Sequence, residues 1–144
     1  MSLGPVHAGC VAIGGRGVLI CGASGAGKSD LAMRLIDRGA ALVADDYVSL
    51  RPEAGQVIAS APKSIAGRIE LRGVGLLTLP YLGEAPVALV VDLDFAPERL
   101  PDPATRDFCG VPLPAIGLNA LEPSAAIKVE AALTLHGVSP PCLA

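Results

Sequence analysis

Aromatic residues are scarce in this chain of 144 residues, where they make up 3% of the sequence and tryptophan is absent. A hydrophobic core must therefore be built from aliphatic side chains, and the hydrophobic fraction of 51% supplies them. At this length we expect one domain, and folding buries about two-thirds of the surface that the unfolded chain exposes. The apolar composition also suggests that part of this surface is buried between subunits, so we expect a homo-oligomer.

Basic residues are few as well, because 11 Lys and Arg face 14 Asp and Glu, which gives a net charge of −3. A protein that follows the phosphate backbone of nucleic acid needs a clustered basic surface, so we expect no nucleic-acid partner. No apolar run reaches the ~18 residues that span a bilayer, and the first residues lack the pattern of a secretory leader. We therefore expect no membrane partner and a cytoplasmic location.

Spacings typical of metal or redox sites are missing. The four cysteines do not form a C-x-x-C pair, which argues against zinc, haem and redox motifs, and we expect buried or uninvolved thiols. The two histidines, His7 and His136, are too far apart in the sequence to indicate a metal pair. The cysteines are Cys10, Cys21, Cys109 and Cys142.

A glycine-rich stretch dominates what is present. Residues 22–29 read Gly-Ala-Ser-Gly-Ala-Gly-Lys-Ser and fit the pattern G-x-x-x-x-G-K-[ST], between an apolar run at 17–21 and a helix-like segment at 30–38. Glycines let the backbone approach phosphate oxygens, and the next helix directs its unpaired N–H groups at the anion. Lys28 adds positive charge, and the Ser29 hydroxyl is a ligand for Mg²⁺. The predicted nucleotide-binding residues are Gly22, Ala23, Ser24, Gly25, Ala26, Gly27, Lys28 and Ser29. A glycine-rich turn that matches by chance is the alternative.

Two further features lie close to this stretch in the sequence. Residues 6–13 and 17–21 read as a β-hairpin, which brings His7 near the glycine-rich stretch, although a purely structural histidine is the alternative. The buried-strand pattern at 41–44 stops at Asp45 and Asp46. Buried carboxylates need a partner, so this pair implies a cation or a reacting proton, and a solvated turn is the alternative.

The second half gives weaker signals. Periodicity does not distinguish helix from loop at 65–77, where Glu70 and Arg72 stand between glycines and indicate either a ligand contact or an internal ion pair. The strongest strand pattern, at 87–94, includes Asp92 and Asp94, which are candidates for holding Mg²⁺ through water.

Beyond this strand, the pattern changes. Residues 95–110 read as a surface loop, and 111–118 as an extended segment that its two prolines confine to an edge or a loop. Residues 124–136 read as a helix that Ser124 caps and Gly137 ends.

Three stretches together resemble the catalytic domain of HPr kinase/phosphorylase: residues 22–29, Leu42-Val-Ala-Asp-Asp46 after Arg38-Gly39, and Ile69-Glu-Leu-Arg-Gly-Val-Gly-Leu76. The third is the specific one, because ordinary phosphate-loop proteins lack it. The resemblance covers most of the chain and implies an α/β fold, namely a single P-loop kinase domain of the HPr kinase/PEP-carboxykinase-like type with a mixed sheet and flanking helices. It also implies that residues 1–144 are one catalytic domain without the regulatory N-terminal domain of longer members.

The resemblance implies an activity and a set of roles. ATP and Mg²⁺ would be the cofactors, and a serine of HPr, the phosphocarrier of the bacterial phosphotransferase system, would be the acceptor. Lys28 would contact the phosphates, Ser29 and Glu70 would hold Mg²⁺, Asp46 would take the proton of the serine hydroxyl, and Asp45 would support the metal or the base. The remaining positions that match active-site residues of the family are His7, Arg72 and Arg99.

One segment departs from the family pattern. Where bidirectional members carry Pro-x-x-Pro-Gly-Arg-Asn, this chain has Leu118-Asn-Ala-Leu-Glu-Pro-Ser124. We therefore predict a kinase with weak or missing phosphorylase activity. Hexamers are usual in the family and are expected here. A P-loop kinase of small molecules and a non-catalytic nucleotide-binding module are the alternative functions.

Overall fold

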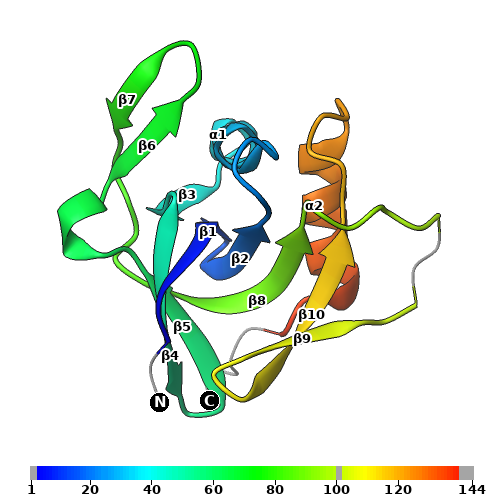
Figure 1. Ribbon diagram of the computed structural model, residues 1–144. Coiled ribbons are helices and arrows are strands. Elements are labelled where there is room, and N and C mark those ends of the chain that lie inside the picture. Colours follow the sequence, from blue (N-terminus) through cyan, green and yellow to red (C-terminus); the bar gives the residue numbers. More distant parts are fainter. Residues whose placement is uncertain (1–2, 100–101, 140–144) are drawn as a thin grey trace.

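The structure, a computed structural model, describes residues 3–99 and 102–139. It is a mixed β-sheet with flanking helices, which confirms the predicted α/β class (Figure 1). The helices are α1 (Lys28–Asp37), α2 (Ala125–His136) and the short 3₁₀ helix η1 (Lys63–Ile65). The strands are β1 (Leu3–Ile13), β2 (Arg16–Cys21), β3 (Ala41–Ala44), β4 (Tyr47–Glu53), β5 (Gln56–Ser60), β6 (Arg68–Leu71), β7 (Gly75–Thr78), β8 (Ala85–Asp92), β9 (Thr105–Phe108) and β10 (Val111–Gly117).

Five strands close into a ring. They follow the order β2, β1, β4, β5 and β8, and β8 pairs with β2 again. The β1–β2 hairpin has the antiparallel pairing that the sequence predicts, whereas β2 and β8 run parallel. Strand β3 pairs with β1, and β10 extends the sheet beyond β8. The carboxyl ends of β2 and β8 therefore lie side by side, with Cys21 opposite Asp92.

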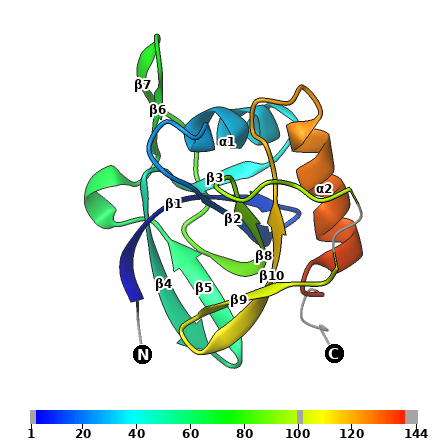
Figure 2. The same cartoon turned by 45° about the vertical axis from the view of Figure 1, so that its right-hand side comes forward.

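Alternation along the strands divides the aliphatic side chains between two cores. On one face, Val18, Ile20 and Leu89 pack against apolar residues of α1 and α2. On the other face, Cys10, Leu19 and further residues from β4, β5 and β8 pack against each other. Figure 2 shows α1 above the strands and α2 to their right, with β4, β5 and β9 in the lower part. The glycine-rich stretch thus leads from a buried strand into a helix that packs on the sheet.

Three segments differ from, or go beyond, their sequence predictions. The stretch that periodicity left undecided contains the β6–β7 hairpin, which projects from the ring (Figure 1). The surface-loop prediction for 95–110 is wrong at Thr105–Phe108, because β9 pairs there with β10. The edge-or-loop prediction for β10 is also wrong, since β10 runs between β8 and β9. Its prolines are tolerated because Val111–Pro114 pair with β9 alone and only the following residues pair with β8.

The helix ends lie within two residues of their predictions, because α1 begins at Lys28 instead of Asp30 and ends at Asp37 instead of Arg38. Gly39 follows α1 with φ 111°, a left-handed conformation that glycine adopts without strain, and its N–H donates to the carbonyl oxygen of Ile36. Ser124 is the N-cap residue of α2, but its side chain makes no capping hydrogen bond. No helix in the described part of the chain has the length and apolar character that crossing a membrane requires. Cys142 lies outside the described residues, whereas Cys10 and Cys21 are buried as predicted.

Candidate active site

The glycine-rich loop, Gly22–Ser29, connects the carboxyl end of β2 to the first turn of α1, in the strand, loop and helix order that the pattern requires. Two of its glycines, Gly25 at φ 85° and Gly27 at φ 98°, adopt conformations that disfavour residues with a side chain. The first N–H groups of α1 have no partner within the helix and, with the helix dipole, form a site for anions. This segment therefore presents backbone groups that can bind an anion.

Lys28 lies within the loop. Its side chain is 9% exposed, and Nζ donates hydrogen bonds to the carbonyl oxygens of Gly22 at 2.7 Å and Ala23 at 2.9 Å. The backbone of the first two loop residues thus holds the ammonium group in place. In this position it can neutralise negative charge on a bound phosphate.

Ser29 and Asp45 form the closest polar contact between α1 and the end of β3. The Ser29 hydroxyl donates to Oδ1 of Asp45 at 2.7 Å, and Oδ2 of the same carboxylate accepts the backbone N–H of Glu70 at 3.1 Å. Asp45 is 6% exposed, so these two bonds offset much of the cost of burying its charge. One acidic side chain therefore joins three elements that are distant in sequence.

The side chain of Asp46 contacts His7 on β1. Its Oδ1 lies 3.2 Å from Nε2 of His7 on β1, and the His7 ring lies 5.4 Å from that of Tyr47. Asp46 has φ 69°, a conformation that aspartate tolerates better than most residues, and its carbonyl oxygen accepts the N–H of Ala8. Because the Asp46 side chain is 65% exposed, an incoming hydroxyl group can reach it.

The β6–β7 hairpin brings two more predicted residues to the loop. Ile69 is fully buried and joins the core that contains α1, which anchors the hairpin beside the helix. The Glu70 side chain is exposed, and only its backbone contacts Asp45. A Cβ built on Gly25 would lie 3.9 Å from Nη2 of Arg72, so this guanidinium lies next to the loop.

Arg99 is the predicted site residue that the structure does not connect to the others. It is exposed in the segment after β8, and no hydrogen bond or ion pair within residues 3–99 and 102–139 joins it to the glycine-rich loop. Its assignment to the site stays a prediction.

Two carboxylates at the end of β8 have other partners than a metal. Asp92 is 7% exposed and forms an ion pair with Arg106 at 2.9 Å, and Asp94 Oδ1 accepts the N–H of Ala23 at 3.0 Å. Arg106 was missed because it lies in a stretch that reads as a surface loop. Two signals could have found it. A buried carboxylate needs a cation, and Arg106 is two residues from Phe108, a spacing that places both side chains on the same face of a strand.

The oxygen atoms beside the loop fit Mg²⁺ that is also bound to phosphate. Such an ion keeps several water molecules and needs only one or two protein carboxylates, and Ser29 Oγ and Asp45 Oδ1 are already adjacent. Within the described ranges no three His, Cys, Asp or Glu side chains gather into a metal cluster. The resemblance implied Ser29 and Glu70 as the ligands and Asp45 as support for the metal or the base. In the structure the carboxylate of Asp45 lies against Ser29, and the assignment of Glu70 stays a prediction.

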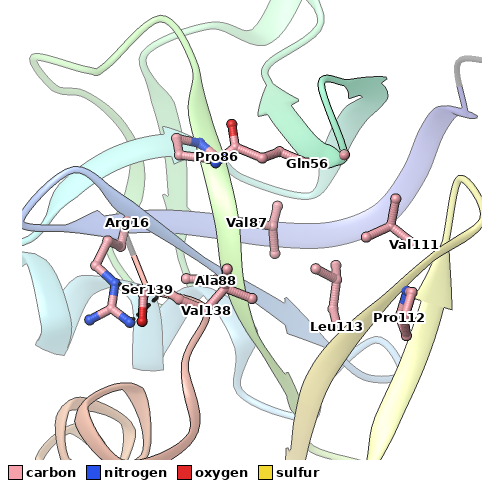
Figure 3. Close-up of a pocket in the computed structure, with 11 residues that line it drawn as sticks. Arg16, Gln56, Pro86, Val87, Ala88, Val111, Pro112, Leu113, Val138 and Ser139 are labelled. Atoms are coloured by element: carbon pink, nitrogen blue, oxygen red, sulfur yellow. Dashed lines mark hydrogen bonds between the residues drawn. The ribbon is translucent and has the colours of Figure 1, made fainter. Parts of the chain in front are cut away.

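A pocket of about 320 Å³ lies away from this site. Figure 3 shows residues that line it, among them Arg16, Gln56, Val87, Ala88 and Leu113. It is at the amino end of β8, between the residues that pair with β5 and those that pair with β10. The glycine-rich loop is at the opposite end of that strand, so the pocket is not part of the candidate site.

Comparisons with known proteins point to one family. The model of the HPr serine kinase C-terminal domain matches residues 3–90. An HPr kinase/phosphorylase of Bordetella pertussis is 40% identical over 143 residues, which cover 89% of this chain and 46% of that protein. One of Clostridium tetani is 44% identical over 77 residues, which cover 54% of this chain and 25% of that protein. The chain thus spans less than half the length of these curated relatives.

A solved structure gives the same result for the fold. The structure of the HPr(Ser) kinase/phosphatase from Coxiella burnetii superposes with a TM-score of 0.81 at 29% sequence identity. The match covers 93% of this chain and 96% of that one.

Proposed function

Because the chain belongs to the HPr serine kinase C-terminal domain family, we propose that it is an ATP- and Mg²⁺-dependent kinase that phosphorylates a serine of HPr. The observation that carries this proposal is the contact between Ser29 and Asp45 beside the glycine-rich loop, with Asp46 next in the chain and open to solvent. A phosphate site, two oxygens suited to a metal and an accessible carboxylate are the parts that phosphoryl transfer to a hydroxyl requires. The proposal treats residues 1–144 as one catalytic domain in the cytoplasm.

The loop and Lys28 bind the triphosphate. Backbone N–H groups of the loop and of the first turn of α1 donate to phosphate oxygens, and Lys28 adds a charge that faces the β and γ phosphates. Ser29, together with Asp45 or the predicted Glu70, would hold Mg²⁺, which would compensate charge on the triphosphate when bound. Arg72, next to Gly25, offsets further charge on the transferring group, and we assign the same role to Arg99.

Asp46 is the general base of the proposed reaction. It accepts the proton of the serine hydroxyl while the serine oxygen forms a bond to the γ phosphorus and the bond from that phosphorus to the ADP oxygen breaks. His7, 3.2 Å away, holds the carboxylate in place. Catalysis then consists mainly of positioning and charge compensation, as is usual for phosphoryl transfer.

The reverse reaction with inorganic phosphate is proposed to be weak. The segment from Leu118 to Ser124 lacks the glycine and arginine of bidirectional members, yet it lies against the loop: a Cβ built on Gly27 would be 3.1 Å from Cβ of Ala120. Arg34 holds this segment through the carbonyl oxygens of Ala120 and Glu122. The segment therefore has the right place for a role in phosphorolysis but not the side chains.

A comparison of acceptors tests the proposal. The purified chain is incubated with Mg-ATP and either HPr, HPr whose acceptor serine is changed to alanine, or a panel of small hydroxyl compounds. Phosphate transfer to HPr alone, lost in the alanine variant, is expected. Transfer to a small molecule would support the alternative of a small-molecule kinase, and nucleotide binding without transfer to any acceptor would support the non-catalytic module. In the reverse assay, rapid release of pyrophosphate from serine-phosphorylated HPr and phosphate would contradict weak phosphorolysis.

A further inference from the structure

Two carboxylates stand beside a site that we propose binds a triphosphate, and the mechanism above uses neither. Asp92 ends β8, directly opposite Cys21, the residue before the glycine-rich loop. Asp94 follows two residues later, and the N–H of Leu93 between them donates to the carbonyl oxygen of Cys21 at 2.8 Å. Negative charges in this place repel phosphate, so their presence calls for an explanation.

Hydrogen bonds connect these carboxylates to the loop in one continuous series. Oδ1 of Asp94 accepts the N–H of Ala23 at 3.0 Å. The N–H of Asp94 itself donates to Oδ1 of Asp92 at 2.9 Å. Oδ2 of Asp92 accepts a hydrogen bond from Nη1 of Arg106 at 2.9 Å. A guanidinium on β9 is therefore linked through two aspartates to the second residue of the loop.

The far end of the series is fixed by packing. The guanidinium of Arg106 lies 5.2 Å from the centre of the Phe108 ring, which is 6% exposed. Strand β9 is held by β10, where Leu113 pairs with Arg106, and the other end of β10 pairs with β8 at Asp92. Asp92, 7% exposed, thus has a neutralising partner that is itself held by the sheet.

The near end of the series presses against the loop. A Cβ built on Gly22 would lie 3.1 Å from Cβ of Leu93 and 3.6 Å from Oδ1 of Asp94. The turn after β8 therefore fits closely against the start of the loop. Since the N–H groups of such a loop bind phosphate best when their orientation is fixed beforehand, a hydrogen bond at Ala23 limits the conformations that the empty loop would otherwise sample.

We propose that Asp94 is a positioning residue that fixes the glycine-rich loop for nucleotide binding, and that Arg106 acts on the loop through Asp92 and Asp94. The inference rests on the proposed function, because it assumes that the loop binds ATP. The geometry gives Asp94 a favourable effect on ATP affinity, although its charge alone would oppose binding.

Two substitutions at Asp94 separate these effects. Asp94→Asn keeps an oxygen that accepts the N–H of Ala23 and removes the charge, whereas Asp94→Ala removes both. If Asp94 positions the loop, calorimetric titration will show that the alanine variant binds Mg-ATP about tenfold or more weakly than the unchanged chain. The asparagine variant will bind Mg-ATP with near-normal or higher affinity. Alanine and asparagine variants that both bind Mg-ATP as tightly as the unchanged chain, or more tightly, would overturn the proposal.

Substitutions at Arg106 test the rest of the series. Arg106→Gln should weaken Mg-ATP binding, and Arg106→Lys should restore part of it. In the double variant with Asp94→Ala the two losses should not add, because both act through one contact. Additive losses would overturn the role assigned to Arg106. Asp107→Asn, an exposed change on the adjacent residue of β9, is the matched control, and melting temperatures verify that each variant folds.

Binding is measured instead of transfer to HPr so that the two hypotheses can fail separately. If the unchanged chain binds no Mg-ATP, the proposed function fails and this inference fails with it. If the unchanged chain binds Mg-ATP and the alanine variant is not weakened, only the inference fails.

Discussion

The hydroxyl of Ser29 lies 2.7 Å from Oδ1 of Asp45, and the other oxygen of that carboxylate accepts the N–H of Glu70 at 3.1 Å. This side chain is the point at which the start of α1, the end of β3 and the β6–β7 hairpin meet. Removing its charge should therefore affect metal binding, and removing the whole group should also affect the fold.

Asp45→Asn should reduce the dependence of ATP affinity on Mg²⁺. The amide oxygen can still accept the N–H of Glu70 and the amide nitrogen can donate to the Ser29 hydroxyl, but the negative charge that attracts the cation is lost. Titrations with ATP in the presence and absence of Mg²⁺ measure the effect. An asparagine variant whose Mg²⁺ dependence equals that of the unchanged chain would show that Asp45 is not involved and would favour the carboxylate of Glu70. Glu70→Gln is the paired variant.

Asp45→Ala should also destabilise the protein by about 1–3 kcal/mol, because the Glu70 N–H loses its buried acceptor. Chemical denaturation of the two Asp45 variants side by side gives this difference. Equal stability of the alanine variant and the unchanged chain would mean that the hydrogen bond to Asp45 does not stabilise the hairpin and that apolar packing of Ile69 and Leu77 holds it.

Lys28→Met should abolish phosphate transfer and leave the fold intact. Methionine keeps the apolar stem of a side chain that is 9% exposed, while the charge and the bonds to the carbonyl oxygens of Gly22 and Ala23 are lost. Transfer to HPr and the melting temperature are the two measurements. Substantial transfer by a folded variant would rule out the role that we assign to Lys28.

Asp46→Asn should lower the rate of transfer about a hundredfold or more and preserve ATP binding, as expected for loss of a general base. Asparagine tolerates the left-handed conformation of this residue at φ 69°, so the backbone should not change. Single-turnover transfer rates and ATP titrations give the two quantities. If the asparagine variant keeps the full rate, another group takes the proton.

The buried thiols predict a loss of stability at alkaline pH. Burial raises the pKa of Cys10 to about 12 and that of Cys21 to about 11, so the folded protein keeps both protons where the unfolded chain releases them. The stability present below the unfolded pKa is therefore lost as the pH rises from 9 towards 11. Denaturation between pH 8 and pH 10.5 measures this loss, and a Cys10→Ala, Cys21→Ala variant should lose less. Equal losses in both proteins would show that other groups cause the effect.

Much of the site could be predicted because its signals are local. The glycine-rich loop needs its pattern between a strand and a helix, and the Asp45-Asp46 pair needs only the end of an apolar strand. The antiparallel pairing of Ala8 with Cys21 brings His7 to the start of the loop, as the hairpin reading suggested. Its contact with Asp46 follows instead from the pairing of His7 with Tyr47 on β4.

Contacts between distant segments were not predictable in this way. The bond from the N–H of Glu70 to Asp45 depends on how the β6–β7 hairpin docks beside α1, and no periodicity in that hairpin reveals it. The pair formed by Asp92 and Arg106 likewise requires β9 to join the sheet through β10. The four residues of β9, with the charged residues Arg106 and Asp107 in the middle, do not have a clear strand pattern. The sequence therefore did not identify Arg106 as the partner of Asp92.

Mapping of phosphate on HPr by mass spectrometry, after incubation with this chain and Mg-ATP, tests the central claim most directly. The account predicts phosphate on one serine of HPr, formed by the unchanged chain and almost absent with the Asp46→Asn variant. Phosphate on histidine, or none on HPr while the chain still binds Mg-ATP, would contradict it.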